Sequence, residues 1–297
     1  MAQLILVLNP GSTSTKAAVY EDEHPLMLKS IGHTNQDLSP YPALNDQLDY
    51  RVALVRSWLA QEGFDLKRLA AVVGRGGIIP NIVAGGYQVD AGLLDCLRHH
   101  TVFDHASNLG GLMAREFAEP LRIPAYIYDA VTSGELTDVA KITGFVDIER
   151  RSFCHVLNAR ATAHKYAQAM GRTYEDMNLV VAHLGGGISI SAHSHGRIID
   201  SVSDDAGPFS PDRAGSLNMQ YVVELCYSGR YTKAEMMRKI RGEGGMSALL
   251  GTHDAREIER RIQAGDEHAA LVYRAQALQI AKGVGIGTSA HAVGTSK

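Results

Sequence analysis

The sequence is poor in the features that usually identify a function. Its 297 residues contain three cysteines, Cys96, Cys154 and Cys226, with no C-x-x-C pair, so neither a disulfide framework nor a zinc site is indicated. Each cysteine has apolar or small neighbours, which favours buried, reduced thiols. The apolar run Leu4–Leu8 is only strand-length, and no basic segment precedes it. Since no run approaches a membrane span, we expect a cytoplasmic protein that does not bind a membrane.

The sequence also lacks a large excess of charge of either sign. The formal net charge is −3 and no run of Lys or Arg occurs, so nothing favours nucleic acid as a partner. Glycine, in contrast, is plentiful, with 30 residues often in pairs and triplets. Such clusters suit a backbone that approaches a ligand closely or adopts positive φ. The length exceeds that of one average domain, which predicts two lobes.

Strand-like and helix-like segments alternate along the chain, which predicts an α/β protein. The expected strands are Leu4–Leu8, Ala17–Tyr20, Met27–Gly32, Ala70–Val73, Pro124–Tyr128, Leu179–His183 and Ile188–Ala192. The expected helices are Ala43–Gln61, Leu109–Phe117, Val156–Met170, Met219–Tyr227, Lys233–Arg241, Ala255–Ala264 and Glu267–Lys282.

An approximate internal repeat indicates that the two lobes are similar. Residues 7–14 and residues 181–188 both read as an apolar strand, a turn of small residues and the start of a second strand. We therefore expect two related lobes facing each other across a cleft. The charged stretch Asp147–Ser152 suggests a boundary that gives lobes of residues 1–150 and 151–297.

The first repeat contains a candidate phosphate loop, residues 9–16. It is neither a Walker loop nor a G-x-G-x-x-G dinucleotide loop. It offers a tight turn whose backbone amides can surround phosphate oxygens, together with hydroxyl groups and a lysine. The candidate nucleotide-binding residues are Asn9, Gly11, Ser12, Thr13, Ser14 and Lys16. On spacing alone, a plain polar hairpin explains this segment equally well.

The second repeat carries Gly185, Gly186 and Gly187 between two apolar strands. Each glycine costs roughly 0.5–1 kcal/mol relative to alanine, so three in a row make little sense for stability. Close approach of a phosphate chain would explain them. Two matched loops on a repeated scaffold therefore favour phosphoryl transfer over two plain hairpins.

Seven segments, in this order, resemble the butyrate kinase family: LNPGSTSTK, VGRGG, HASNLGG, HVLNARATAHKYA, VAHLGGGISISAH, GPFSPDRAG and LLGTHDARE. More distantly, they are similar to acetate kinases of the sugar kinase/hsp70/actin superfamily. The resemblance implies two actin-like, ribonuclease H-like lobes around a nucleotide cleft. It also implies reversible, ATP- and Mg²⁺-dependent conversion of a four-carbon or branched carboxylate to its acyl phosphate, by a homodimer or higher homo-oligomer.

A carboxylate is already ionised at neutral pH, so this chemistry needs positioning and cations more than a strong base. Arg75 lies between glycines after a buried strand; by resemblance it would hold the substrate carboxylate or the transferring phosphoryl group. The alternative is an ordinary surface-loop arginine. Arg213 matches the arginine of the acetate kinase T-R-S-G segment, and a planar guanidinium suits a phosphoryl group. Its alternative is a turn stabilised by Asp212.

Asp129 follows a predicted strand and matches the F-D-T segment of acetate kinases, which implies an Mg²⁺ ligand acting mostly through water. A helix N-cap is the competing interpretation. The candidate histidines are His105, His183 beside the glycine triplet, and His155, which would steady the phosphoryl group. His164 competes with His155 because its surroundings also resemble the acetate kinase H-G-T-S-H-x-Y stretch.

The carboxyl end departs from the family. After residues 279–282 the chain reads GVGIGTSAHAVGTSK. Neither the following strand nor the L-T-G-G turn, which cups adenosine in related kinases, is visible there. We therefore expect a shortened or altered second lobe. Two hypotheses follow: an active carboxylate kinase that closes its nucleotide site with this tail or a dimer partner, or a catalytically impaired remnant that binds phosphate or a partner. Another actin-like phosphotransferase is a third possibility.

Overall fold

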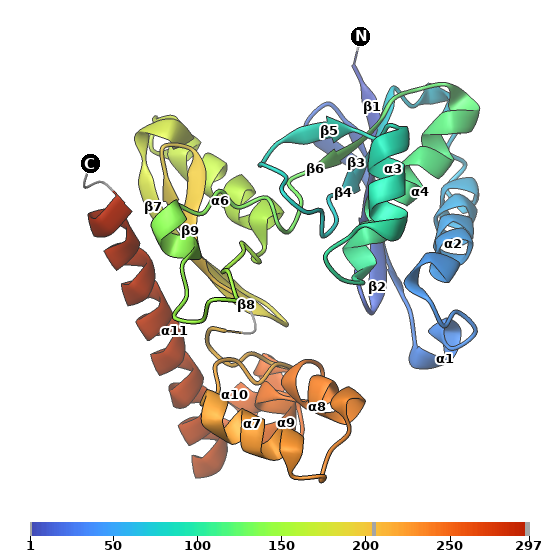
Figure 1. Cartoon of the computed structure of the whole chain (residues 1–297). Helices are drawn as coiled ribbons and strands as arrows, with labels where there is room; N and C mark the ends of the chain where they lie inside the picture. The colour runs from blue at the N-terminus through green and yellow to red at the C-terminus, as the bar shows by residue number, and fades with distance from the viewer. Residues whose placement is uncertain (1, 204–205, 295–297) are drawn as a thin grey trace. The chain divides into compact units, whose positions relative to one another are not determined.

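A computed structural model describes residues 2–203 and 206–294 of the chain (Figure 1). The chain forms two compact units, residues 1–133 and residues 134–297. This division comes earlier than the boundary that we expected at residue 150. Residues 134–150 belong to the second unit because they bond to its sheet. The N–H of Thr137 donates to the carbonyl oxygen of Ile199 (3.0 Å), and Arg150 Nη2 donates to Asp200 Oδ1 (2.7 Å).

The first unit is a mixed sheet with packed helices. Its strands are β1 (Leu4–Pro10), β2 (Ser14–Glu21), β3 (His24–Gly32), β4 (Ala71–Arg75), β5 (Gly86–Gln88) and β6 (Ala125–Tyr128). Its α-helices are α1 (Asn35–Leu38), α2 (Gln47–Gln61), α3 (Ala91–His99) and α4 (Leu109–Ala118). The sequence did not predict α1, β5 or α3. Helix α2 begins at Gln47 rather than at Ala43, because a 3₁₀ turn, Leu44–Asp46, precedes it.

Strand order brings the candidate residues of this unit to one edge. Within the described residues the sheet runs β3-β2-β1-β4-β6-β5, with β1, β4 and β6 parallel. Parallel strands need crossover connections, and these run through α2 and α4. The carboxyl ends of parallel strands meet at the same edge, so the β1–β2 loop, Arg75 at the end of β4 and Asp129 after β6 share that edge.

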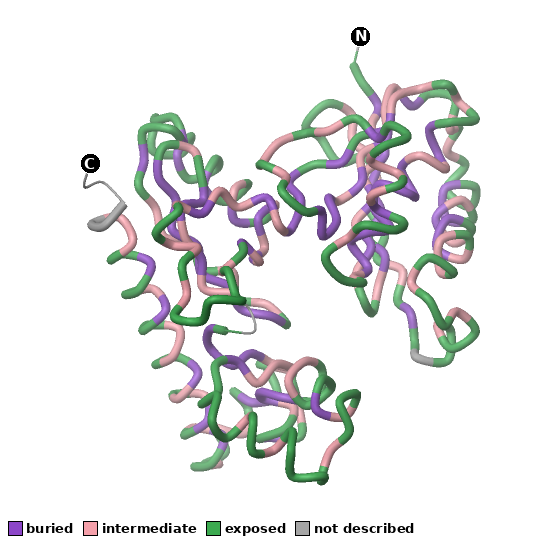
Figure 2. Tube along the Cα trace, in the orientation of Figure 1, coloured by how far each residue is buried: buried purple, intermediate pink, exposed green. Residues whose placement is uncertain are grey.

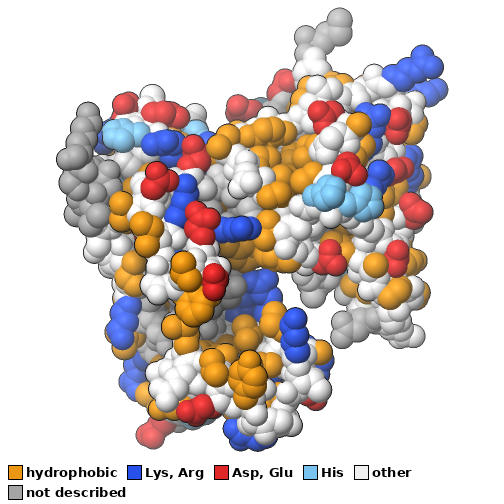
Figure 3. All heavy atoms as spheres, viewed as in Figure 1, with side chains coloured by type: hydrophobic (Ala, Val, Ile, Leu, Met, Phe, Trp, Pro, Cys, Tyr) orange, Lys and Arg blue, Asp and Glu red, His pale blue; other side chains and the backbone are white. Residues whose placement is uncertain are grey.

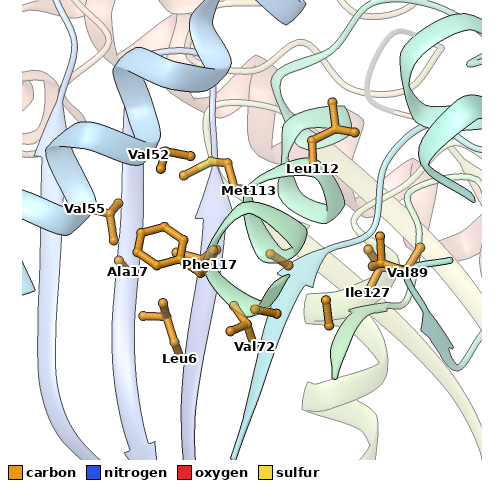
Figure 4. Packing of buried hydrophobic residues seen from close by; sticks show 14 of the residues in the cluster. Leu6, Ala17, Val52, Val55, Val72, Val89, Leu112, Met113, Phe117 and Ile127 are labelled. Carbon is orange, nitrogen blue, oxygen red and sulfur yellow. The ribbon is translucent and has the colours of Figure 1, made fainter. Parts of the chain in front are cut away.

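The core of the first unit lies between this sheet and its helices (Figure 4). Val55 of α2 and Phe117 of α4 are buried among side chains from the central strands, including Leu6 and Val72. Fully burying one such side chain contributes about 1.5–3 kcal/mol, so the helices hold the strand ends in a fixed arrangement.

The second unit combines a small sheet with a helical layer. Its strands are β7 (Asn178–Leu184), β8 (Ile188–Ser194) and β9 (Arg197–Val202). Its α-helices are α5 (Asp138–Lys141), α6 (Val156–Ala169), α7 (Met219–Tyr227), α8 (Lys233–Ile240), α9 (Gly245–Leu250), α10 (Ala255–Gln263) and α11 (Glu267–Gly294). The sequence did not predict β9, α5 or α9. Within the described residues the sheet order is β7-β8-β9, and every residue of the central strand β8 is buried.

The predicted internal repeat is confirmed. β1 and β2 form an antiparallel hairpin around residues 11–13, and β7 and β8 form another around residues 185–187. The surroundings differ, because β1 is an interior strand of its sheet whereas β7 is an edge strand. The two candidate loops therefore occupy equivalent places in two differently supported hairpins.

Helix α11 corrects the expectation for the carboxyl end. We predicted a helix ending at Lys282, but α11 continues to Gly294, and residues 295–297 lie outside the described part. Buried positions recur at helical spacing along it (Figure 2). A Cβ on Gly283 would lie 2.4 Å from Ile190 Cδ1, and one on Gly287 would lie 2.9 Å from Val180 Cγ1. These glycines let the helix approach the sheet, and this packing outweighs their poor helix propensity.

No helix in the described ranges is long and apolar enough to cross a membrane. Acidic and basic side chains are interspersed on the face seen in Figure 3, in keeping with the small net charge. All three cysteines are unpaired thiols, but they are not all buried. Cys154 is buried and Cys96 is half-buried, whereas Cys226 is exposed because α7 contributes no buried residue to the fold.

Candidate active site

The loop between β1 and β2 is a tight turn. The N–H of Gly11 donates to the carbonyl oxygen of Ser14 (2.7 Å), which closes the turn. Ser12 and Thr13 lie exposed at its tip. Each hydroxyl of the tip is therefore accessible to a ligand, as the phosphate-loop interpretation requires.

Asn9 and Lys16 flank this turn. They lie directly opposite each other in the antiparallel register of β1 and β2. Residues in such a pair project from the same face of the sheet, so the amide and the ammonium group are available on one side. Lys16 is exposed and Asn9 is half-buried.

A buried arginine, which the sequence did not single out, supports the loop from within the fold. Arg51 of α2 is 1% exposed. Its Nη1 donates to the carbonyl oxygen of Gly11 (3.0 Å) and to Thr15 Oγ1 (2.9 Å). Thr15 Oγ1 also lies 2.8 Å from Nε2 of the buried His33. The loop is thus fixed to the unit by polar contacts at its base.

Arg75 is the last residue of β4 and is half-buried. Burial lowers the pKa of its guanidinium, yet no carboxylate among the described residues pairs with it. An arginine retains its proton at neutral pH even after a moderate shift. Arg75 is therefore a partly desolvated cation at the strand edge where the loop also lies.

The glycines around Arg75 serve packing rather than ligand approach. A Cβ on Gly74 would lie 2.0 Å from the carbonyl oxygen of Gly110, and a Cβ on Gly110 would lie 2.2 Å from the carbonyl oxygen of Arg75. A Cβ on Gly76 would lie 2.5 Å from the Cα of Ala130. Helix α4 and the chain after β6 therefore pack directly against the backbone that carries Arg75, which restricts where this residue can move.

Asp129 follows β6 and is 3% exposed. Its φ is +43°, an unusual value for a residue with a side chain. Its Oδ1 accepts a hydrogen bond from the N–H of Gly85 (2.9 Å), and its own N–H donates to the carbonyl oxygen of Gly85 (3.0 Å). No helix begins here in the described chain, so the N-cap interpretation is wrong. Backbone strain of this kind often marks a functional residue.

His105 lies in a locally cross-linked segment. Its Nδ1 is 2.7 Å from Ser107 Oγ and accepts a hydrogen bond from the N–H of Ser107 (3.2 Å). Asn108, nearby, accepts a hydrogen bond at Oδ1 from the N–H of Ile78 (2.8 Å). Since Ile78 follows Arg75 closely in sequence, these contacts tie the His105 segment to the chain that leaves β4.

In the second unit, the glycine triplet is fixed by a serine of the GPFSPDRAG segment. Ser210 Oγ donates to the carbonyl oxygen of Gly186, and the N–H of Gly185 donates to the carbonyl oxygen of Gly187 (3.2 Å). A Cβ on Gly186 would lie 3.7 Å from Asp212 Oδ2, an ordinary contact distance. The fold therefore has room for a side chain at position 186, which leaves ligand approach as a reason for glycine there.

His155 and His183 form a stacked pair. Their ring centroids are 3.7 Å apart and their planes differ by 10°. His155 Nδ1 lies 2.8 Å from Oγ of the buried Ser189, and His183 Nδ1 lies 2.9 Å from Asn158 Nδ2. The stack therefore lies beside the glycine triplet, because Ser189 and His183 flank that loop. His164, the alternative to His155, is exposed and packs against Tyr174 instead.

Arg213 lies in a half-buried cluster of charges. Its Nε is 3.6 Å from Asp212 Oδ1, and it forms a β-bridge with Arg241. Burial, with a further contribution from Arg241, lowers the pKa of Arg213 to about 10, so it stays protonated at neutral pH. Burial also raises the pKa of Asp212, outweighing the attraction of His253 and Arg241. The Asp212 alternative thus holds only in part: the carboxylate contacts Arg213, but two arginines share the cluster.

Within each unit the structure brings predicted residues together. The first unit places the β1–β2 loop, Arg75 and Asp129 at one sheet edge, with the His105 segment bonded to the chain after Arg75. The second unit connects the glycine triplet to the histidine stack and to the Arg213 segment. Other side chains support these residues and were not predicted from the sequence: Thr15, His33, Arg51, Asn158, Ser189, Ser210 and Arg241.

The potential metal ligands of the described residues suit Mg²⁺ better than a metal held entirely by protein side chains. No cluster of three or more His, Cys, Asp or Glu side chains able to hold a metal occurs among the described residues. Mg²⁺ usually takes one or two carboxylates and completes its shell with water and phosphate oxygens. A buried carboxylate at a strand's carboxyl end, such as Asp129, suits that role.

Comparison with known proteins gives concordant matches. The sequence model of the acetokinase family matches residues 148–293. Probable butyrate kinase 2 of Caldanaerobacter subterraneus subsp. tengcongensis is 46% identical over 282 residues, which cover 95% of this chain and 80% of that protein.

Solved structures show the same fold at much lower identity. Porphyromonas gingivalis acetate kinase is 19% identical with a TM-score of 0.78, and the match covers 97% of this chain and 80% of that one. Entamoeba histolytica acetate kinase gives a TM-score of 0.75 at 14% identity, covering 97% and 79%. A Francisella tularensis propionate kinase gives 0.70 at 18% identity, covering 96% and 80%. The predicted α/β fold of the actin-like class is thereby confirmed.

Proposed function

This chain belongs to the acetokinase family, and we propose that it transfers the γ-phosphoryl group of ATP to the carboxylate of butyrate or a branched short-chain acid. In the reaction, a carboxylate oxygen bonds to the γ-phosphorus while the bond from that phosphorus to the β–γ bridging oxygen breaks. ADP leaves, and the acyl phosphate remains. The step is reversible, because both phosphate compounds are reactive anhydrides.

The carboxylate nucleophile needs no base, so the residues act by position and charge. We assign Arg75 to the substrate carboxylate or the transferring phosphoryl group, and Arg213 to the phosphoryl oxygens. Both are protonated, partly desolvated guanidinium groups, and an anion gains more from such a cation than from one in water. A planar guanidinium also matches two phosphoryl oxygens at once.

The two hairpin loops are assigned to the nucleotide phosphates. In the first, Asn9, Ser12, Thr13, Ser14 and Lys16 supply amide, hydroxyl and ammonium donors. In the second, Gly185–Gly187 let phosphate oxygens approach the backbone, and His183 lies beside them. His155 and His105 are assigned to steadying the phosphoryl group. Mg²⁺, when bound by Asp129 through water, would neutralise further charge on the phosphate oxygens.

The observation that carries the proposal is the 46% identity, over nearly the whole chain, to the protein named probable butyrate kinase 2. The structure supports it by keeping the candidate residues on supported strand ends in each unit. The choice of acid rests on this likeness alone, since one methylene changes discrimination by only about 1–3 kcal/mol. A homodimer is part of the proposal, and sedimentation equilibrium would test it.

Trapping acyl phosphate as its hydroxamate tests the proposal. Purified protein with ATP, Mg²⁺ and hydroxylamine should yield hydroxamate with butyrate, isobutyrate or isovalerate, and less with acetate. Propionate should fall between. Folded protein that binds ATP but gives no hydroxamate with any of the five acids would contradict the proposal and favour a catalytically impaired phosphate-binding protein.

A further inference from the structure

We propose that Arg51 is a positioning residue of the first phosphate loop, and that its buried positive charge favours an anion bound there. This inference rests on the proposed function in one respect: the β1–β2 loop must be the one that receives phosphate. It concerns a side chain that touches the loop only from inside the fold, and therefore acts through the loop rather than on the reacting atoms.

The contact geometry orients a peptide group. Arg51 Nη1 donates to the carbonyl oxygen of Gly11 (3.0 Å), and that carbonyl shares its peptide unit with the N–H of Ser12. In a trans peptide the carbonyl and the N–H point in opposite directions, and no peptide bond of the described chain is cis. Arg51 thus turns the N–H of Ser12 away from the core, at the exposed tip of the loop. An outward backbone N–H is the donor that a phosphate oxygen needs.

The second contact of Arg51 strengthens this orientation. Nη1 also donates to Thr15 Oγ1 (2.9 Å), and Thr15 is fully buried at the start of β2. The N–H of His33 donates to the carbonyl oxygen of Thr13 (2.8 Å), which holds the other side of the turn. Both ends of the loop are therefore held by their carbonyl groups, which leaves its tip free to present donors.

The charge of Arg51 has no counter-ion among the described residues. Its Nε and Nη2 both bond to Gln47 Oε1, at 3.2 and 2.9 Å, and Gln47 is a neutral amide. A buried guanidinium without a carboxylate is costly, and proteins usually pair such a group. An anion at the outer side of the loop would compensate it through the intervening peptide, which explains why the charge is tolerated.

The groups packed against Arg51 do not provide that compensation. His33 is 7% exposed, and its Nδ1 is a buried atom without a hydrogen-bond partner in the described chain. Burial first, and then the charge of Arg51, lower the pKa of His33, so it stays neutral at neutral pH. Tyr50, the neighbouring residue, has a raised pKa through burial and is likewise uncharged. Asp37, whose charge alone would raise the pKa of both His33 and Tyr50, is bonded to Thr34 and forms no ion pair with Arg51 among the described residues. Arg51 is therefore left without an ion-pair partner beneath the loop.

Inorganic tripolyphosphate, titrated into the full chain by calorimetry, tests the proposal without any turnover. Arg51→Met keeps the length of the side chain but removes its charge and donors, and should weaken tripolyphosphate binding about tenfold or more. Arg51→Lys should recover part of this loss. Arg56→Met is the matched control: Arg56 lies on the same helix and donates to the carbonyl oxygen of Glu116 (2.8 Å), away from the loop. Its affinity should stay within about twofold of the parent chain.

Gln47→Glu separates charge from architecture. It is isosteric and places a carboxylate against Nε and Nη2 of Arg51, which forms the missing ion pair without removing any contact. If Arg51 has only a structural role, this variant should bind tripolyphosphate as well as the parent does. If its charge serves the ligand, affinity should fall several-fold although the fold is as stable as before. The variant also remains informative if Arg51→Met fails to fold.

Steady-state kinetics give a second readout. The KM for ATP should rise in Arg51→Met and Gln47→Glu, while the KM for the acid stays unchanged. Parent-like tripolyphosphate affinity in folded Arg51→Met, or in Gln47→Glu, would overturn the inference, as would a parent chain that binds no tripolyphosphate. If Arg51→Met and Gln47→Glu bind tripolyphosphate more weakly but the parent chain makes no acyl phosphate, the inference about Arg51 is upheld and the proposed function is refuted. If the parent chain makes acyl phosphate but the two variants keep its KM for ATP, the proposed function is upheld and the inference about Arg51 is refuted.

Discussion

The two hairpin loops share one backbone arrangement but are held in place in two different ways. The β1–β2 loop bears hydroxyl and ammonium side chains at its outer surface, and a buried arginine fixes it from behind. The β7–β8 loop bears no side chains at all. It is fixed from the side by Ser210 and is flanked by a histidine stack.

The difference follows from where each hairpin lies in its sheet. β1 is an interior strand under a large core, so a helix residue such as Arg51 can reach its loop from within. β7 is an edge strand of a smaller sheet, and its loop is supported instead by the irregular segment around Ser210 and Arg213. Sequence similarity between the repeats therefore extends to the backbone but not to the groups that hold it.

Removing the guanidinium groups of both units tests whether the units contribute equally. Arg75→Ala and Arg213→Ala should each lower kcat by about 10²–10³-fold, because each withdraws a cation from developing negative charge. Arg75→Ala should leave stability unchanged, since its guanidinium bonds to no carboxylate among the described residues. Hydroxamate formation and urea unfolding together check this. Near-normal turnover in either variant would remove that residue from the proposal.

Acid should destabilise the second unit through His193. This side chain is fully buried between Tyr174 Oη (2.6 Å) and Ser191 Oγ (2.7 Å), and burial is the main reason that its pKa falls from 6.5 to about 4. The unfolded chain therefore takes up a proton below pH 6.5 that the folded chain resists. The stability is fully present above pH 6.5 and is lost as the pH falls towards 4, by on the order of 3 kcal/mol.

Urea midpoints measured from pH 7 to 4.5 check this, with His193→Gln as the comparison. That variant should be less stable at neutral pH but should show a flatter pH profile. The lowered pKa of His33 gives the first unit a contribution of the same sign, so His33→Gln should also flatten the profile. A profile as steep in His193→Gln as in the parent would show that other groups dominate.

Helix α11 should prove essential to the sheet that carries the second loop. Gly283→Leu forces a side chain against the buried Ile190 and should destabilise the fold by about 1–3 kcal/mol. Gly285→Leu is the matched control, because nothing lies within 4 Å of a Cβ at that position. There, replacing glycine in a helix should stabilise by about 0.5–1 kcal/mol. Equal effects of the two substitutions in thermal unfolding would argue against the packing of α11 on β8.

The smallest expected change in stability concerns the glycine triplet. Gly186→Ala adds one methyl group where the nearest atom is 3.7 Å away, so stability should change by less than about 0.5 kcal/mol. If the glycine is there to admit phosphate, kcat/KM for ATP should nevertheless fall about tenfold. An unchanged kcat/KM would mean that the second loop does not approach the nucleotide as closely as proposed.

The fold class and both hairpins could be predicted from the sequence because they depend on local patterns. Apolar strands, turn residues and glycine clusters are readable one segment at a time. Arg75 and Arg213 could be singled out as candidates in the same way, since each lies in a short motif, but their roles stay predictions. The extension of α11 beyond Lys282 was not, because glycines and small residues argue against a helix until the packing partner Ile190 is known.

The supporting residues were missed for a related reason. Arg51 lies on the same face of its helix as the buried Val55 and Leu59. A charged residue on an apolar helix face could have pointed to a buried arginine. Its partners, Gly11 and Thr15, are some forty residues away in sequence, so the contact itself was unreadable. The same holds for Ser210 and Gly186. The role assigned to each site residue, the lobe assignment and the cytoplasmic location stay predictions.

We propose that both units serve the transfer of a phosphoryl group to a carboxylate. Phosphorus NMR of the reaction with ATP, Mg²⁺ and butyrate labelled with oxygen-18 tests it most directly. We expect one acyl phosphate for each ADP, with an isotope shift that shows the bridging oxygen to come from butyrate. ADP accompanied only by unlabelled inorganic phosphate, or no consumption of ATP at all, would contradict it.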